Sequence, residues 1–170
     1  IQPFFLGLGF MNPHIPYHFP TEYASLYPAP TSFAIAKFQA LDSSQPTVGW
    51  YDQGDTFTSP VGMDTYGDVQ HLGGGIAFQR PMNTTHQRIV RRNNYAATTF
   101  TDAQLGRVLN AMDEMDLTNN TLVCSFADHG QALGEQNLWE KMSVFEASTR
   151  VHLIIRAPWL PLSAGKVVSS

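Results

Sequence analysis

An aspartate and a histidine stand next to each other directly after an apolar stretch of the chain. Asp128, His129 and Gly130 follow the residues TLVCSFA at 121 to 127, and the glycine allows the backbone to approach a bound ion closely. A carboxylate suits a hard cation such as calcium or magnesium, and a histidine nitrogen also binds zinc. Asp128 and His129 are therefore candidate metal ligands. The alternative is a structural role, in which Asp128 caps a turn and His129 is a half-buried histidine with satisfied hydrogen bonds.

A second histidine has a setting that suits proton transfer. His14 is flanked by Pro13 and Pro16, which hold the surrounding backbone in few conformations. A rigid loop is a good mount for a proton-transfer group, and imidazole titrates near neutral pH. The alternative is a surface histidine in a proline-rich turn.

A lysine follows the aspartate at a short distance along the chain. Lys141 stands thirteen residues after Asp128, in a segment that contains Trp139 and Phe145. A lysine among aromatic side chains could supply positive charge to an anionic substrate, or its stem could lie along the surface. A salt bridge is a further alternative, because the segment also contains Glu135, Glu140 and Glu146.

Three apolar runs have the lengths and boundaries of buried strands. They cover residues 3 to 10, 121 to 127 and 151 to 158, and such runs are typical of strands that are buried on both faces of a parallel sheet. Residues 11 to 20 contain three prolines, so we expect a loop at the carboxyl end of the first strand. Ligands of parallel sheets bind at the carboxyl ends of the strands, where His14 and Asp128 would then lie.

The remaining elements connect these strands. Residues 84 to 116 predict a long amphipathic helix, because small and apolar residues recur at three- or four-residue steps. Residues 21 to 27 predict one or two helical turns capped by Thr21. Residues 28 to 82 have a weak pattern and are expected to be an insertion that lines a cleft. The order of elements predicts an α/β domain with a parallel sheet.

The composition argues against several classes of protein. Charged residues make up 14% and aromatic residues 12%, which excludes a globally disordered chain. The net charge of -4 argues against a nucleic-acid partner, and the helical spacing of Arg88, Arg91 and Arg92 predicts a solvated face. No run approaches ~18 apolar residues, so no transmembrane segment is expected. The single cysteine, Cys124, allows no internal disulfide. The low charge content and the start at Ile1 predict a part of a longer protein.

Three segments contain motifs that, taken together and in this order, resemble those of the sulfatase family. Residues 128 to 155, DHGQALGEQNLWEKMSVFEASTRVHLII, resemble a late family signature that contains Asp-His-Gly, Trp-x-Lys and Phe-Glu. The opening PFFLGLGFMNPHIP is similar to the family's Pro-Phe-Phe-Leu strand with a following Lys-Pro-His-x-Pro. Residues 94 to 123 resemble the long helix before the metal-binding strand. The resemblance covers residues 2 to 27 and 83 to 160, and the iduronate sulfatase group is the most similar within the family.

The resemblance implies a three-layer α/β/α alkaline-phosphatase-like domain with a mostly parallel central sheet, incomplete at its N-terminus. It also implies hydrolysis of sulfate esters at one bound calcium by a formylglycine, which the family makes from the first residue of Cys/Ser-x-Pro-Ser-Arg. Asp128 and His129 align with two metal ligands. His14 aligns with the histidine that contacts the sulfate ester, and would donate a proton to the leaving oxygen. Lys141 aligns with the lysine that holds a sulfate oxygen.

The sequence also departs from the family pattern. It contains no Cys/Ser-x-Pro-Ser-Arg motif and no Asp-Asp pair for the other metal ligands. Both are expected upstream of Ile1, so residues 1 to 170 alone are expected to be inactive, as the later part of a sulfatase catalytic domain. Gln136, Met142 and His152 replace residues that are common in the family, which bears on substrate specificity.

Two other functions stay open on the sequence. One is a metal-dependent phosphodiesterase or phosphonate hydrolase of the same superfamily, with zinc in place of calcium. The other is a non-catalytic remnant that binds sulfated glycans. The Pro-His-x-Pro and Trp-x-Lys spacings favour the sulfatase, whose partner would be a sulfated small molecule or glycan. Possible N-glycosylation sites at Asn83 and Asn119 favour a secreted or lysosomal protein.

Overall fold

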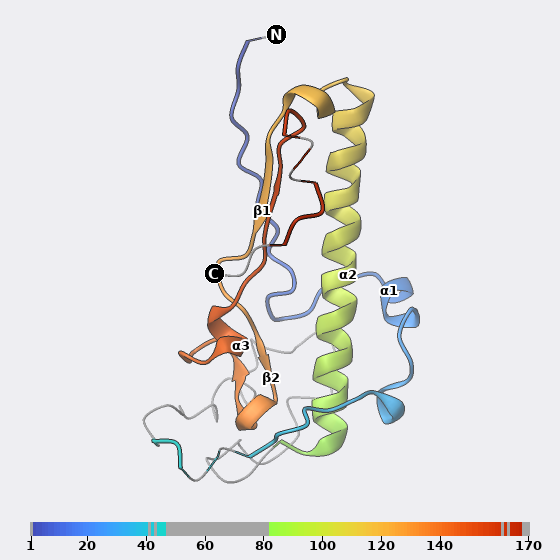
Figure 1. Cartoon of the computed structure of the whole chain (residues 1–170). Helices are drawn as coiled ribbons and strands as arrows, with labels where there is room; N and C mark the ends of the chain where they lie inside the picture. Colours follow the sequence, from blue (N-terminus) through green and yellow to red (C-terminus); the bar gives the residue numbers. More distant parts are fainter. Residues whose placement is uncertain are drawn as a thin grey trace.

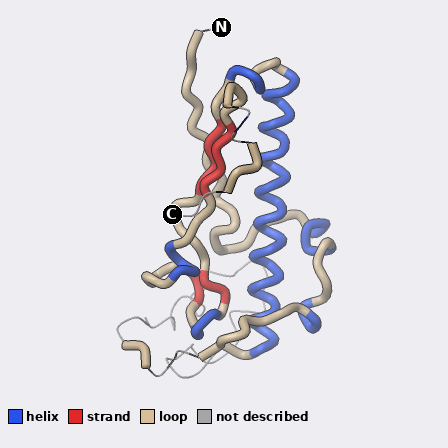
Figure 2. Tube along the Cα trace, viewed as in Figure 1, coloured by secondary structure: helices blue, strands red, loops and turns tan. Residues whose placement is uncertain are grey.

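One long helix organises the molecule. The computed structural model describes residues 2–40, 42, 44–46, 82–160, 162 and 164–167. The helix α2 (Thr84–Glu114) runs along most of the length of the molecule, with the short helix α1 (Thr21–Ser25) on one side and the strands on the other (Figures 1 and 2). Most of the insertion expected at residues 28 to 82 lies outside the described residues. No described helix has both the length and the apolar character needed to cross a membrane.

The long helix confirms the prediction from the sequence to within two residues at its end. It begins after Asn83, whose Oδ1 accepts the backbone N–H of Thr85 at 2.8 Å and so satisfies one free donor of the first turn. Its buried residues are polar or small in the first half of the helix: Gln87, Val90, Asn93, Asn94, Ala96 and Ala97. This face therefore offers hydrogen-bonding groups to the loops that pack on it.

The two later strands form where the sequence predicts them but pair in the opposite sense. β1 (Val123–Phe126) and β4 (Leu153–Arg156) are antiparallel, with Phe126 opposite Leu153. A parallel pair needs a crossover connection, usually a helix, that carries the chain back to the starting end. The intervening chain has no α-helix longer than the four-residue α3 (Glu146–Thr149) and returns at the end where β1 finishes. The parallel pairing expected for these two segments is therefore wrong.

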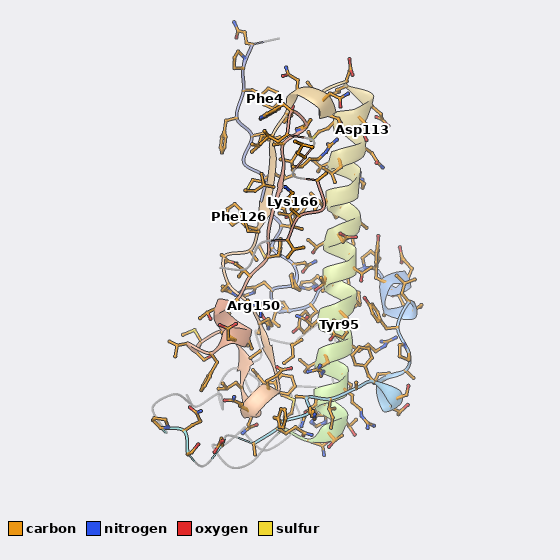
Figure 3. The ribbon with its side chains drawn as sticks, viewed as in Figure 1. Phe4, Tyr95, Asp113, Phe126, Arg150 and Lys166 are labelled. Carbon is orange, nitrogen blue, oxygen red and sulfur yellow. The ribbon has the colours of Figure 1, made fainter. Side chains whose placement is uncertain are left out.

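The prediction of a strand at residues 3 to 10 is also wrong, because these described residues form no strand. The segment has no regular secondary structure and is exposed throughout, with Phe5 94% accessible. Figure 1 shows it as an extended trace, and Phe4 is labelled on it in Figure 3. Its apolar side chains have the character of a buried strand, but no described strand pairs with its backbone. The following loop at 11 to 20 forms as predicted.

A short hairpin lies between the antiparallel strands. β2 (Ala132–Leu133) pairs with β3 (Trp139–Glu140), and a single 3-10 turn, η5 (Glu135–Asn137), connects them. Leu133 and Trp139 join the main hydrophobic cluster with Tyr17, Met82, Val90 and Ala97. The sequence suggests no regular element here, because two-residue strands are too short to show a period.

Arginines attach the α1 side of the molecule to α2. α1 (Thr21–Ser25) is preceded by Pro20 without a side-chain cap, so the predicted Thr21 cap is wrong. After the 3-10 turn η1 (Pro30–Ser32), the carbonyl of Thr31 accepts a hydrogen bond from Arg88 at 2.5 Å. Arg92 donates to the carbonyls of Pro28 and Ala24 at 2.9 and 2.5 Å. These arginines bind backbone carbonyls, which corrects the solvated face expected from their spacing.

Aromatic rings complete this contact. Tyr27 stacks on Tyr95 of α2 with ring centroids 6.0 Å apart, and Phe33 lies 5.3 Å from the same ring. Figure 3 labels Tyr95 on the side of α2 that faces α1. The rings and the arginine bonds together hold residues 21 to 33 on the helix.

Replacement of Arg92 by alanine is expected to weaken this attachment. Two carbonyls lose a charged donor, which should lower the free energy of unfolding by about 1–3 kcal/mol. Urea unfolding of the purified protein measures the change. Arg107→Ala is the matched control on the same helix, since Arg107 is exposed and its one side-chain hydrogen bond to the described residues goes to the side chain of Gln104, at 2.9 Å. Equal effects of the two substitutions would show that the carbonyl contacts contribute little.

Candidate functional site

The structure brings His14 and Lys141 into direct contact. Lys141 Nζ lies 3.0 Å from His14 Nε2, although 127 residues separate them in the chain. His14 Nδ1 is 2.5 Å from the carbonyl oxygen of Ile15. A carbonyl only accepts, so Nδ1 carries a proton and Nε2 is free to accept from the Lys141 ammonium. His14 is exposed and Lys141 half-buried, which leaves the pair open to a ligand.

The loop that carries His14 is anchored on both sides of the histidine. Its backbone N–H donates to the carbonyl of Met11 at 2.9 Å, and the Asn12 side chain donates to the carbonyl of His18 at 2.7 Å. The hydroxyl of Thr101 in α2 shares its proton between the carbonyl of Asn12, at 3.2 Å, and that of Ala97 in the same helix, at 3.1 Å. These bonds hold the proline-rich loop against the long helix.

An ion pair anchors the hairpin that carries Lys141. Arg91 Nη1 lies 3.0 Å from Glu135 Oε1 and donates to the carbonyl of Leu133 at 2.7 Å. The second oxygen of Glu135 accepts the backbone N–H of Leu133 at 2.7 Å. Only 12% of the Arg91 side chain is exposed, so this arginine also departs from the solvated face expected for it. Lys141 itself has no ion pair to a described carboxylate within 4.0 Å.

The residue before Lys141 is an acid that points inward. Glu140 is only 8% exposed, and its φ of 65° is in the left-handed region, which is costly for a residue with a side chain. Burial raises the pKa of its carboxyl group, and the charges of Lys141 and His14 act in the opposite direction. Burial also raises the pKa of the Tyr17 hydroxyl, with an added contribution from Glu140. The sequence suggested only a salt bridge for Glu140, because no pattern in so short a strand reports its burial.

Asp128 and His129 form a turn directly after β1. Asp128 Oδ1 accepts the backbone N–H of His129 at 3.1 Å, as the structural alternative expects. His129 Nδ1 is 2.7 Å from the carbonyl oxygen of Gly130, so Nδ1 carries the proton and Nε2 presents its lone pair. Nε2 lies 3.5 Å from Asp128 Oδ2. The two atoms that could bind a metal therefore face each other.

Their separation fits a shared cation. Two ligands at right angles on calcium, with bonds of about 2.3–2.6 Å, lie roughly 3.3–3.7 Å apart. The Asp128 side chain is 85% exposed and that of His129 34%, so both are accessible. No group of three or more His, Cys, Asp or Glu side chains suited to a metal occurs among the described residues. The pair thus supplies two ligand positions, and no hydrogen bond or ion pair connects it to His14 or Lys141 within the described chain.

Gly130 fixes the position of this turn against α3. Its N–H donates to the carbonyl of Ser148 at 2.8 Å. A Cβ atom at Gly130 would lie 2.3 Å from the carbonyl oxygen of Ala147 and 2.9 Å from that of Arg150. Only glycine leaves room for these two backbone segments to pack.

Gly130→Ala is therefore expected to destabilise the protein. The methyl group meets backbone atoms that cannot rotate away, and such overpacking costs about 1–3 kcal/mol. Gly106→Ala in α2 is the matched control, because a Cβ there meets nothing within 4 Å. Alanine at that helical position should stabilise the protein by about 0.5–1 kcal/mol. Thermal unfolding of the two variants should show opposite changes, and a stable Gly130→Ala protein would contradict the packing argument.

Comparison with known proteins gives relatives for both sequence and fold. The chain is 35% identical to mouse (Mus musculus) iduronate 2-sulfatase and 34% identical to the human (Homo sapiens) protein, over 92% of the chain and 27% of each relative. A protein named sulfatase from Formosa agariphila is 29% identical over 94% of the chain and 28% of its own length. The chain thus spans little more than a quarter of these relatives.

Two solved structures share the fold. They are phosphonate monoester hydrolases from Silicibacter pomeroyi and Agrobacterium radiobacter, with TM-scores of 0.62 and 0.61 and identities of 24% and 23%. They match 86% and 92% of the chain and 27% and 30% of their own chains. This likeness confirms the expected alkaline-phosphatase-like α/β fold, of which the chain holds an incomplete part. A family model described as Sulfatase matches residues 1–164, and the chain belongs to the sulfatase family.

Proposed function

We propose that the protein that contains this chain hydrolyses sulfate esters, and that residues 1 to 170 are the later part of its catalytic domain. The observation that carries the proposal is the contact between His14 and Lys141 at 3.0 Å. It places a lysine ammonium and an imidazole nitrogen at one accessible point, where a sulfate group could bind both. The membership of the sulfatase family supports this choice of anion.

Each member of the pair has a distinct part in the reaction. The Lys141 ammonium holds a sulfate oxygen and stabilises the charge that shifts during cleavage of the ester. The bond of His14 Nδ1 to Ile15 leaves Nε2 as the atom that faces the substrate. When a sulfate oxygen accepts the hydrogen bond of the Lys141 ammonium in place of His14, Nε2 loses that bond and is free to act. Nε2 then takes a proton from solvent and passes it to the leaving alcohol oxygen as the ester bond breaks.

Asp128 and His129 are the proposed metal ligands in this chain, with calcium as the cation. Bound there, the ion would neutralise charge on the sulfate group and polarise the bond that breaks. The facing lone pairs of Asp128 Oδ2 and His129 Nε2 support this assignment. The nucleophile is proposed to be a formylglycine from a Cys/Ser-x-Pro-Ser-Arg motif, which residues 1 to 170 do not contain.

A sulfated glycan is the proposed class of substrate, and a sulfated small molecule is the alternative. The names of the mouse and human relatives, iduronate 2-sulfatase, support the glycan. A secreted or lysosomal location follows from the same proposal. It is supported by the exposure of both sequon residues, Asn83 and Asn119.

Phosphonate or phosphodiester hydrolysis, with zinc, is the second candidate, and its support is the fold shared with two phosphonate monoester hydrolases. Assays of nitrophenyl sulfate and nitrophenyl phenylphosphonate with the same full-length enzyme distinguish the two. A higher kcat/KM for the phosphonate would reverse our preference. Binding of sulfated glycans without turnover of either ester would favour a non-catalytic protein.

Lys141→Ala in the full-length enzyme tests the site directly. Loss of one charge-stabilising donor should lower kcat/KM for nitrophenyl sulfate by about 100- to 1,000-fold, or about 3–4 kcal/mol of barrier. Lys166→Ala is the matched control, since Lys166 is exposed and is labelled away from the hairpin in Figure 3. Turnover near that of the wild type in Lys141→Ala would remove Lys141 from the site.

His14→Ala tests the proton transfer separately from binding. Alkyl sulfates have a poor leaving group and need the proton, so their kcat should fall about 100-fold more than that for nitrophenyl sulfate. His18→Ala, a change of an exposed histidine in the same loop, should leave both rates unchanged. Equal slowing of both esters by His14→Ala would mean that His14 binds sulfate without donating a proton.

A further inference from the structure

Glu140 is a buried acid that has no part in the proposed reaction. Glu140 is the last residue of β3 and directly precedes Lys141. Its side chain is buried, and it pairs with Ala132 on the other strand of the hairpin. Its Oε1 has no hydrogen-bond partner among the described residues. A buried carboxylate in this state needs either a neighbouring positive charge or a proton.

The groups that act on the Glu140 carboxyl group, directly or through Tyr17, come from three parts of the chain. Lys141 supplies positive charge on the side of the site, as does His14 when protonated, and this charge favours the ionised carboxyl group. Tyr17 lies on the buried side with its hydroxyl neutral. Asn94 of α2, beside that hydroxyl, and Ala132 of β2 carry no charge. Among the described residues, the Lys141 ammonium is therefore the main source of stabilisation for a Glu140 carboxylate, and burial opposes it.

An anion on the pair changes this balance. A sulfate group in contact with Lys141 and His14 offsets the positive charge of the Lys141 ammonium and adds a negative charge close to the carboxylate. Both effects favour the protonated form of Glu140. By linkage, protonation of Glu140 must in turn strengthen the binding of the anion.

We propose that Glu140 couples anion binding to proton uptake, an inference that rests on the function proposed above. Its carboxyl group takes one proton from solvent when a sulfate ester occupies the His14–Lys141 pair, and returns it when the product sulfate leaves. The affinity for sulfate is then highest at acidic pH. It falls as the pH rises through the range in which Glu140 is ionised in the empty site and protonated in the occupied one, and levels off above that range. Glu140 acts through the pair and is a positioning residue.

Calorimetric titration of the full-length enzyme with inorganic sulfate tests the coupling. Titrations in two buffers of different ionisation enthalpy give the number of protons taken up per sulfate bound. In the wild type we expect uptake that approaches one proton at its maximum, with affinity falling by up to about tenfold per pH unit there. Glu140→Gln removes the charge with little change of shape, and should bind sulfate without uptake and with an affinity that varies little with pH.

Glu146→Gln is the matched control, because Glu146 lies on α3 with its side chain 84% exposed. It should keep the proton uptake of the wild type. A purely structural role for Glu140 would change the melting temperature but not the proton count. Sulfate binding by the wild type without proton uptake, or uptake that persists in Glu140→Gln and so belongs to His14, would overturn the coupling and leave the sulfatase proposal intact. Absence of sulfate binding by the wild type at any pH would overturn both.

Discussion

The bond network of Arg91 is the constraint on which the candidate site depends. A single guanidinium joins α2 to both the carbonyl of Leu133 and the carboxylate of Glu135. The Arg91 side chain is only 12% exposed, and hydrogen bonds made by a charged group typically contribute about 1.5–3 kcal/mol. The hairpin that holds Lys141 is therefore fixed to the helix, and the loop of His14 is fixed to the same helix through Thr101. One rigid element thus sets the distance between two side chains that are remote in sequence.

Helix α2 serves this purpose because its buried face is unusually polar. Gln87 donates to the carbonyl of Met82 and to the side chain of Gln39, each at 2.8 Å. A wholly apolar face would gain more from burial, but it could not bind the carbonyl groups of irregular segments. Loops that carry functional side chains have many such groups, and each must find a partner when it is buried. The polar face of α2 gains less from burial than an apolar face would, but it can form hydrogen bonds with the loops that pack on it.

The sequence predicted local structure better than pairing. The long helix and the two later strands leave clear apolar periods or runs, and the structure has them within a few residues. The run at residues 3 to 10 was misleading because β-propensity reports how well side chains suit a buried strand, whereas a strand also needs a neighbour to bond. Strand direction depended on the 26 residues between β1 and β4, whose hairpin of two-residue strands has no detectable period. A solvated face was predicted for Arg88, Arg91 and Arg92 because helical spacing shows only that they share one side of the helix. It does not show which segments pack against that side.

The two halves of the candidate site differ in how far the described residues complete them. His14 and Lys141 were found separately by residue type, and only the fold could show their contact, which needs no further residue to form. Asp128 is largely surrounded by solvent, and water competes strongly for a cation held by only two protein ligands. Binding of a metal must therefore depend on additional ligands, while binding of an anion depends on charges that are already in place. Because the two dependences are separate, a failure to bind metal would not argue against sulfate binding at His14 and Lys141.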